Sequence, residues 1–183
     1  MCIRDRCDGK RFILLPTAQD HKRLLEDDKG PNTGGMGAYS PAPLLTKDYL
    51  DRIINEIIEP TIDELNKKNI DYRGVIYFGL MITKYGPKVI EYNCRFGDPE
   101  CQTIMPLMDQ NFIFLLEKCS MGNLTGQEKI ESSDKVSGCV IATSKGYPRE
   151  YKTGFPIKIG KIDTTDCQIF DSGTSLSEDG ELL

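Results

Sequence analysis

The sequence predicts an α/β protein of the α+β type, in which an antiparallel sheet with flanking helices precedes the start of a small β-rich domain. An apolar run at 74–83 is typical of a buried strand, and the turn at 85–87 returns it into a second β-forming run at 88–95. Apolar residues between 46 and 66 recur with a helical period, which indicates an amphipathic helix. Beyond a polar stretch at 126–135, the remaining β-forming runs are short.

That polar stretch is the predicted domain boundary, which separates residues 1–130 from residues 131–183. The second part contains three predicted strands, at 137–144, 157–159 and 167–170. Three strands without a helix are too small to bury a core of their own. We therefore expect the chain to be a piece of a longer protein that is cut within its C-terminal domain.

The composition argues against several classes of protein. Of the 183 residues, 39% are hydrophobic and 28% are charged, which suits a globular protein with a real core. The net charge of −5 argues against a nucleic-acid surface, and no run resembles a transmembrane helix or a secretory signal. Seven scattered cysteines without a C-x-x-C pair, beside a single histidine, argue against a zinc site. Such thiols fit a reducing, cytoplasmic location.

Turn and capping residues predict the elements of the first part. Asp8-Gly9 indicates a hairpin turn before a strand at 11–15. Thr46 is the predicted N-cap of the amphipathic helix, and Pro60 kinks or restarts that helix. The apolar stripe of the helix is interpreted as core rather than as a cofactor site, and it contains Leu50, Ile53, Ile54, Ile57 and Ile58. Two further helices are predicted, at 99–108 and 112–119.

The run 88–100 carries the most specific chemistry of the chain. Alternate residues of a strand share a face, so Glu91, Asn93 and Arg95 are predicted to line up. Carboxylate and amide oxygens are hard ligands that Mg²⁺ prefers when phosphate oxygens complete its octahedron, and a guanidinium can hold a phosphate bidentately. A polar surface strand would also explain so short a motif, but the turn that follows favours a phosphoryl-transfer site.

The turn after this strand predicts an anion site. Asp98 is the predicted N-cap of the next helix, and Pro99 is its predicted first residue. The N-terminus of a helix attracts anions, because its first N–H groups have no partner within the helix. We therefore expect this helix to begin beside the three polar side chains of the preceding strand.

Two segments near the start of the chain offer further candidate ligands. Residues 20–23 crowd four polar functions into one turn, for which a solvated helix start is an alternative interpretation. The glycine-rich loop at 30–43 can bring backbone N–H groups close to an anion, although it matches neither the dinucleotide-binding nor the Walker pattern. The candidates in these segments are Asp20, His21, Lys22, Arg23, Asn32, Thr33, Gly34, Gly35 and Gly37.

Together these segments resemble a known family. Pro16–Arg23 (PTAQDHKR), Gly30–Pro43 (GPNTGGMGAYSPAP) and Glu91–Glu100 (EYNCRFGDPE) are similar to the phosphoribosylamine–glycine ligase family of the ATP-grasp superfamily. Lys145–Pro148 (KGYP), taken with Asp171–Thr174 (DSGT), resembles the opening of that family's C-terminal domain. Only the first seven residues fall outside the resemblance.

The resemblance implies a fold and a reaction. Residues 1–130 would be the C-terminal part of an ATP-grasp lobe, with the N-terminal domain and an ATP-clamping lobe outside this chain. Glycine would react with ATP to give glycyl phosphate, which the amine of 5-phosphoribosylamine captures. The products would be glycinamide ribonucleotide, ADP and phosphate, in purine biosynthesis. The full-length protein would be a monomer or fused to other purine enzymes, without a nucleic-acid or membrane partner.

The resemblance also implies roles for individual residues. Glu91 and Asn93 match the family's Mg²⁺ or Mn²⁺ ligands, and Arg95 would stabilise the transferring phosphoryl group. Asp98 is the second expected catalytic residue, beside the substrate pocket expected from residues 20–23 and 32–37. Such catalysis depends mostly on positioning and charge neutralisation.

Two departures and two alternatives qualify this expectation. Many ATP-grasp enzymes carry a second metal-binding glutamate on the penultimate strand, but 78–82 contains no carboxylate. Without the clamping lobe, the chain alone is expected not to catalyse the ligation. Another ATP-grasp carboxylate–amine ligase would share E-x-N-x-R without the DHKR and GGMG runs. A non-catalytic nucleotide-binding module would keep the fold without the chemistry.

Overall fold

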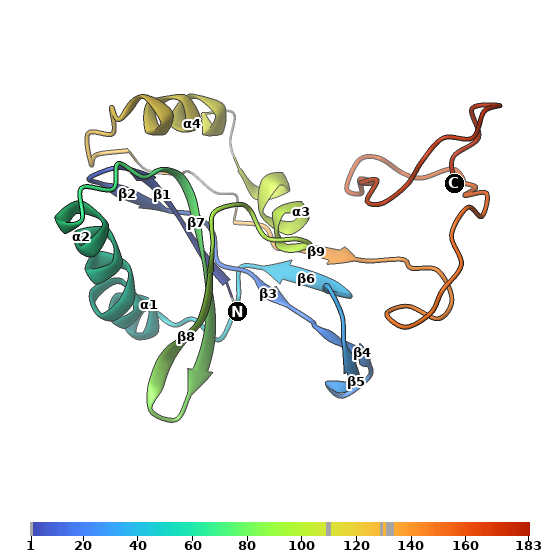
Figure 1. Cartoon of the computed structure of the whole chain (residues 1–183), viewed down its shortest axis with the longest axis horizontal. Coiled ribbons are helices and arrows are strands. Elements are labelled where there is room, and N and C mark those ends of the chain that lie inside the picture. The colour runs from blue at the N-terminus through green and yellow to red at the C-terminus, as the bar shows by residue number, and fades with distance from the viewer. Residues whose placement is uncertain (1, 109–110, 129, 131–133) are drawn as a thin grey trace.

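A four-stranded antiparallel sheet forms the centre of the molecule (Figure 1). The computed structural model describes residues 2–108, 111–128, 130 and 134–183. The strand order is β2-β1-β7-β8, with all neighbouring pairs antiparallel. These strands are β1 Cys2–Asp8, β2 Phe12–Leu14, β7 Arg73–Thr83 and β8 Gly86–Asn93. Both predicted hairpin turns are confirmed, whereas β1 arises largely from residues for which the sequence predicted no element.

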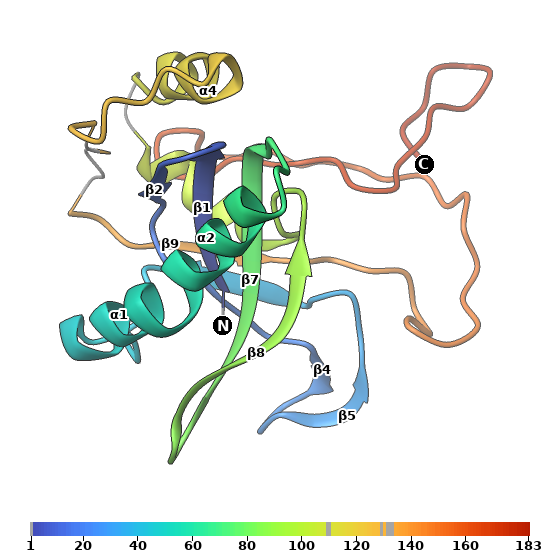
Figure 2. The same ribbon diagram turned by 60° about the vertical axis from the view of Figure 1, so that its left-hand side comes forward.

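Two consecutive helices cover one face of this sheet (Figures 1 and 2). They are α1 Lys47–Ile53 and α2 Glu59–Lys67, joined by a π-helical turn at Ile54–Ile58. Thr46 is the N-cap of α1, and its hydroxyl accepts a hydrogen bond from Tyr49 N, as predicted. The predicted core stripe is confirmed, because a buried cluster joins both helices to β7 and contains Ile53, Ile57, Ile58, Ile62, Ile76, Phe78 and Leu80.

A second, three-stranded sheet lies beside the first and has the order β3-β6-β9. Its strands are β3 Gln19–Asp20, β6 Gly37–Ser40 and β9 Ser137–Val140. A separate two-stranded hairpin is formed by β4 Arg23–Leu25 and β5 Lys29–Asn32. Residues 20–23 are therefore extended, and the helix start considered for them is wrong. The glycine-rich segment includes β5 and β6, so the irregular part of this predicted loop is shorter than expected.

The remaining described helices lie in the chain between β8 of the first sheet and β9 of the second. α3 Glu100–Ile104 continues into a 3₁₀ turn at Met105–Leu107, and it packs on β6 and β9. α4 Phe112–Met121 packs on β1 and β7. The two predicted helices are thus confirmed, with the first one interrupted. No described helix is long and apolar enough to cross a membrane.

The chain beyond β9 differs most from the sequence prediction. The predicted strand at 137–144 ends at Val140, and the predicted strands at 157–159 and 167–170 are absent from the structure, which describes all of these residues. Their apolar side chains are exposed, as at Ile159 and Phe170. A β-forming run needs a neighbouring strand to satisfy its backbone groups, and a single backbone hydrogen bond, from Ile157 N to the Leu182 carbonyl oxygen at 2.8 Å, does not make a ladder. A single bridge joins Leu176 to Leu182.

Candidate functional site

Glu91 and Asn93 project from the same face at the end of β8. In the antiparallel register, they stand opposite Gly79 and Tyr77. Tyr92 lies on the other face, where its ring contacts Phe78 at 5.3 Å between centroids. Since Phe78 belongs to the core under α1 and α2, the carboxylate and the amide point away from those helices. The predicted alignment of Glu91 with Asn93 is therefore observed.

Gly79 makes room for the Glu91 side chain. A Cβ added at Gly79 would lie 2.8 Å from Cγ of Glu91, which is closer than real Cβ contacts allow. Any larger residue at this position would displace the carboxylate. The sequence shows the glycine but not its neighbour across the ladder, so this supporting residue was missed.

Arg95 departs from the predicted alignment. β8 ends at Asn93, and the chain bends over the next two residues, so strand alternation no longer sets the direction of the Arg95 side chain. Its Nη1 donates to the carbonyl oxygen of Phe96 at 2.9 Å, and the side chain is exposed. The expectation that three polar residues share one strand face is therefore wrong for Arg95, because the strand is two residues shorter than predicted.

Asp98 is not a helix N-cap. The N-cap position of α3 is occupied by Pro99, and no side chain caps this helix. The Asp98 carboxylate instead accepts a hydrogen bond from Nε2 of Gln102 at 2.9 Å. α3 itself has five residues, so the helical anion site predicted here is not formed. On β9, burial and then the charge of Asp98 raise the pKa of the Cys139 thiol.

A buried carboxylate that the sequence did not single out lies behind Asn93. Glu100 is 1% exposed, and its Oε1 accepts a hydrogen bond from the hydroxyl of Tyr77 at 2.7 Å. Tyr77 is the residue opposite Asn93 in the ladder. This contact therefore ties the start of α3 to the strand pair that carries Glu91 and Asn93. In the sequence, Glu100 is only a glutamate that follows a turn, and this signal is too weak to predict a buried carboxylate.

The glycine-rich loop is held in place by hydrogen bonds to residues 21–22. Thr33 N and Thr33 Oγ1 both donate to the Lys22 carbonyl oxygen, at 2.7 and 2.9 Å. Met36 N donates to the His21 carbonyl oxygen at 2.8 Å. The loop is thus an ordered structure, and the two segments that the sequence suggested as ligands for one pocket are in direct contact.

Two glycines of the loop allow close packing. A Cβ at Gly35 would come within 2.4 Å of Pro99, and a Cβ at Gly37 would come within 2.5 Å of the Cys139 carbonyl oxygen. Gly35 also has a φ of +133°, which disfavours other residues. These glycines therefore bring the loop against the Asp98–Pro99 turn and against β9. Gly34 differs, because its N–H donates to the hydroxyl of Tyr147 at 2.8 Å.

The charged run before the loop is extended. Lys22 Nζ lies 2.5 Å from Oδ2 of Asp20 and 3.3 Å from the Gly34 carbonyl oxygen. Arg23 Nη1 donates to the Gly30 carbonyl oxygen, and Asn32 is its partner in the β4–β5 ladder. The ring of His21 contacts that of Tyr39. Asp20 and Lys22 are thus beside the loop, whereas Arg23 and Asn32 lie in the adjacent hairpin.

These contacts form a continuous chain through the candidate site. Asn93 lies opposite Tyr77, which bonds to Glu100, and the preceding residue Pro99 packs on the glycine-rich loop. The family model described as the phosphoribosylglycinamide synthetase ATP-grasp (A) domain matches residues 2–101, which include these elements. The chain belongs to this family.

Relatives of the phosphoribosylglycinamide synthetase family match most of the chain. The phosphoribosylamine–glycine ligase of Caldanaerobacter subterraneus is 46% identical over 176 residues, which make up 96% of this chain and 42% of the relative. The trifunctional purine biosynthetic protein adenosine-3 of Gallus gallus is 44% identical over 177 residues, or 96% of this chain and 18% of that protein. The chain thus spans less than half the length of these relatives.

Solved structures confirm the predicted ATP-grasp fold. The phosphoribosylamine–glycine ligase of Thermotoga maritima has a TM-score of 0.87 and 31% identity, and the match covers all of this chain and 44% of that one. The L-amino acid ligase of Bacillus licheniformis has a TM-score of 0.52 at 16% identity, with 79% of this chain and 35% of that chain covered. At that identity, the second likeness concerns the fold alone.

The donor atoms on β8 fit a magnesium-type ion. Glu91 offers a carboxylate and Asn93 an amide oxygen, both of which are hard ligands. Within the described residues, no group of three or more His, Cys, Asp or Glu side chains could hold a metal ion. Mg²⁺ is commonly bound by one or two protein ligands together with substrate phosphates and water, so two donors suit it better than they suit zinc.

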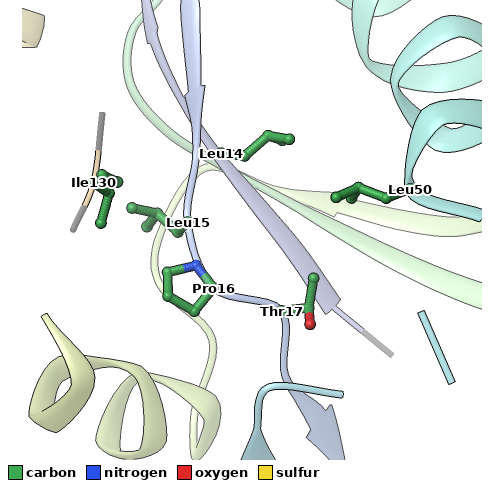
Figure 3. Close-up of a pocket in the computed structure, with 6 residues that line it drawn as sticks. All are labelled: Leu14, Leu15, Pro16, Thr17, Leu50 and Ile130. Atoms are coloured by element: carbon green, nitrogen blue, oxygen red, sulfur yellow. The ribbon is translucent and has the colours of Figure 1, made fainter. Parts of the chain in front are cut away.

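Two apolar pockets lie apart from this arrangement. One, of about 220 Å³, is lined by Leu14, Leu15, Pro16, Thr17, Leu50 and Ile130 (Figure 3). The other, of about 420 Å³, lies between α2 and β8 on the face that carries Tyr92. Neither is lined by Glu91 or Asn93, so neither is the candidate site.

Proposed function

We propose that this chain is the catalytic core segment of a ligase that joins glycine to 5-phosphoribosylamine, using ATP. The family match, which extends over the elements that carry Glu91 and Asn93, is the main support for this proposal. The glycine carboxylate attacks the γ-phosphorus of ATP, and ADP leaves. The amine of 5-phosphoribosylamine then attacks the carbonyl carbon of glycyl phosphate, a proton is lost from nitrogen, and phosphate leaves.

Glu91 and Asn93 are the proposed ligands of a Mg²⁺ or Mn²⁺ ion, which would neutralise charge on the ATP phosphates when bound. Gly79 leaves the Glu91 carboxylate room to point into this face. Arg95, which is exposed just beyond β8, is the proposed partner of the transferring phosphoryl group. Among the described residues it makes one hydrogen bond, to a neighbouring carbonyl, so the other guanidinium donors can turn toward a ligand.

We assign the substrate pocket to the junction of three segments. These are the charged run, with Asp20, His21, Lys22 and Arg23, the loop containing Asn32, Thr33, Gly34, Gly35 and Gly37, and the turn at Asp98. The direct contacts of the loop with residues 21–22 and with Pro99 support a shared pocket. We further propose that residues 131–183 open the next domain of a cytoplasmic enzyme.

A chimera tests the proposed reaction. Residues 8–183 would replace the matching stretch of the Caldanaerobacter relative, and glycine-dependent ADP release and glycinamide ribonucleotide formation would be measured. The chimera is expected to be active, and the 183-residue chain alone inactive. Glu91→Gln should lower the rate at least about a hundredfold, as expected for a group that stabilises charge at a reaction centre. Glu59→Gln, at an exposed position on α2, is the matched control.

Three outcomes would contradict the proposal. ADP release that does not depend on glycine would favour another ATP-grasp carboxylate–amine ligase. Unchanged binding of metal and nucleotide after Glu91→Gln would favour a non-catalytic nucleotide-binding module. Formation of glycinamide ribonucleotide by the isolated chain would refute the need for the remaining lobes.

A further inference from the structure

The turn that leads from β8 into α3 carries Asp98, whose side chain is exposed. The backbone of this turn is fixed on two sides. Cys101 N donates to the Gly97 carbonyl oxygen at 3.2 Å, which closes the turn. On the other side, a Cβ at Gly35 would lie 3.6 Å from the Asp98 carbonyl oxygen. α3 itself packs on β6 and β9 (Figure 1). The backbone of Asp98 is therefore held in place, whereas its exposed carboxylate needs support of another kind.

Gln102, on α3, supplies this support. Its Nε2 donates to Oδ1 of Asp98 at 2.9 Å. The amide group cannot be reversed without loss, because Oε1 would then face the negatively charged carboxylate. The Gln102 amide therefore restricts the directions in which the Asp98 carboxylate can point.

The same amide group lowers the stability of the folded chain. Gln102 Oε1 is buried and has no hydrogen-bond partner among the residues that the structure describes. A buried carbonyl oxygen without a partner is destabilising, since water no longer solvates it. A methionine would fill a similar space without this penalty. Stability alone thus does not explain a glutamine at this position, whereas a function for its N–H group does.

Asp98 differs from the other carboxylate of the proposed substrate pocket. Asp20 is paired with Lys22, whereas Asp98 forms no ion pair with any described residue. A carboxylate without a cation beside it is suited to bind an ammonium group. Of the two amines in the proposed reaction, the one that attacks must be uncharged. Glycine reacts through its carboxylate, so it can keep its ammonium charge throughout.

We propose that Gln102 positions the Asp98 carboxylate so that it binds the ammonium group of glycine. The identity of this substrate rests on the proposed function, whereas the contact between Gln102 and Asp98 rests on the structure. Gln102 is thus a positioning residue that acts through Asp98. It lies just beyond residues 2–101, which the family model matches.

The first test introduces Gln102→Met into the chimera that contains residues 8–183. Methionine keeps the volume and removes the N–H donor, so the Asp98 side chain must become ordered when glycine binds. The KM for glycine is expected to rise about two- to tenfold, as for one side chain immobilised on binding. The kcat at saturating glycine should stay unchanged. Gln127→Met, at an exposed position, is the matched control and should alter neither constant.

Asp98→Asn distinguishes positioning from a general effect on packing. This change keeps an acceptor for Gln102 and removes the charge, so the KM for glycine should rise at least about tenfold. If Gln102 acts through the carboxylate, Gln102→Met should raise the KM less than about twofold further in the Asp98→Asn background. A further rise as large as that in the unsubstituted chimera would overturn the inference.

The 183-residue chain allows a second test that does not depend on catalysis. The Tm of Gln102→Met should equal or exceed that of the wild-type chain, because a buried oxygen without a partner is removed. In NMR spectra, Asp98→Asn should shift the side-chain amide resonances of Gln102. Unshifted resonances would show that the two side chains are not in contact, and the inference would then be wrong.

The remaining outcomes separate the inference from the proposed reaction. Unchanged glycine kinetics of Gln102→Met in an active chimera would overturn the inference and leave the reaction intact. If a lower Tm accompanies those unchanged kinetics, Gln102 is a structural residue. A change in the KM for ATP instead of glycine would remove Asp98 from the glycine site. A chimera that is inactive with Gln102 in place would contradict the reaction and the inference together.

Discussion

At the scale of single residues, the candidate site depends on close packing more than on chemically reactive groups. Gly35 admits Pro99, Gly37 admits the backbone of Cys139, and Gly79 admits the Glu91 side chain. The sequence predicts that the glycines of the loop bring N–H groups close to an anion. In the structure, two of them also allow close packing, because a Cβ at either position would overlap a neighbour.

Gly79→Ala should separate metal binding from stability. The added methyl group would force Glu91 out of its position, yet the contacted atom belongs to a flexible side chain and can move. We expect Mn²⁺ affinity, measured by electron paramagnetic resonance, to fall at least about tenfold, as for other changes that disturb a metal ligand's support.

Gly138→Ala is the matched control, since the nearest atom to its Cβ would be 4.0 Å away. It should leave Mn²⁺ affinity unchanged. Normal affinity in Gly79→Ala would show that Glu91 does not need its observed position to bind the ion.

At the scale of elements, the helical layer over the sheet is the most predictable part of the molecule. The sequence predicts its apolar stripe, its N-cap at Thr46 and its break near Pro60, because each of these depends on residues within a few positions. The end of β8 was not predicted correctly. A strand ends where its partner or its backbone geometry changes, and the E-x-N-x-R pattern contains no such information.

Ile58→Ala should reveal how much this layer contributes to stability. Ile58 is 0% exposed in the cluster beneath the helices, so truncation leaves a cavity and costs about 2–5 kcal/mol of unfolding free energy. Urea denaturation would measure the change. Ile113→Ala, on α4 and 72% exposed, should stay within about 0.5 kcal/mol of wild type. Equal losses in both variants would contradict the assignment of the core to α1, α2 and β7.

At the scale of the whole molecule, side chains fasten helices to the segments that follow them. Glu128 accepts hydrogen bonds from Thr125 N and Gly126 N and pairs with Lys118 of α4 at 3.2 Å. Desolvation raises the pKa of Glu128, but the hydrogen bonds and the lysine outweigh it and bring the pKa to about 2. The charged form is therefore favoured in the folded chain, which connects α4 to the segment after it.

Stability should therefore depend on pH through Glu128. Because its folded pKa lies below the ordinary value of 4.5, the stabilisation is fully present above pH 4.5 and is lost as the pH falls toward about 2. Glu128→Gln should unfold more easily than wild type at pH 7, and the difference should shrink over that acid range. Denaturation curves at several pH values would measure it. Glu117→Gln, exposed on the same helix, should show no such trend.

The sequence by itself determined the family, the hairpin β7–β8, the helical layer and the shared face of Glu91 and Asn93, because these depend on local periodicity, capping and alternation. The tertiary structure decided which distant residues meet: Tyr77 with Glu100, Gly35 with Pro99, and Tyr147 with Gly34. It also decided that residues 157–159 and 167–170 stay irregular. A strand, a buried charged group or a pocket wall needs a partner from elsewhere in the chain, and the local sequence does not predict which residue that partner is.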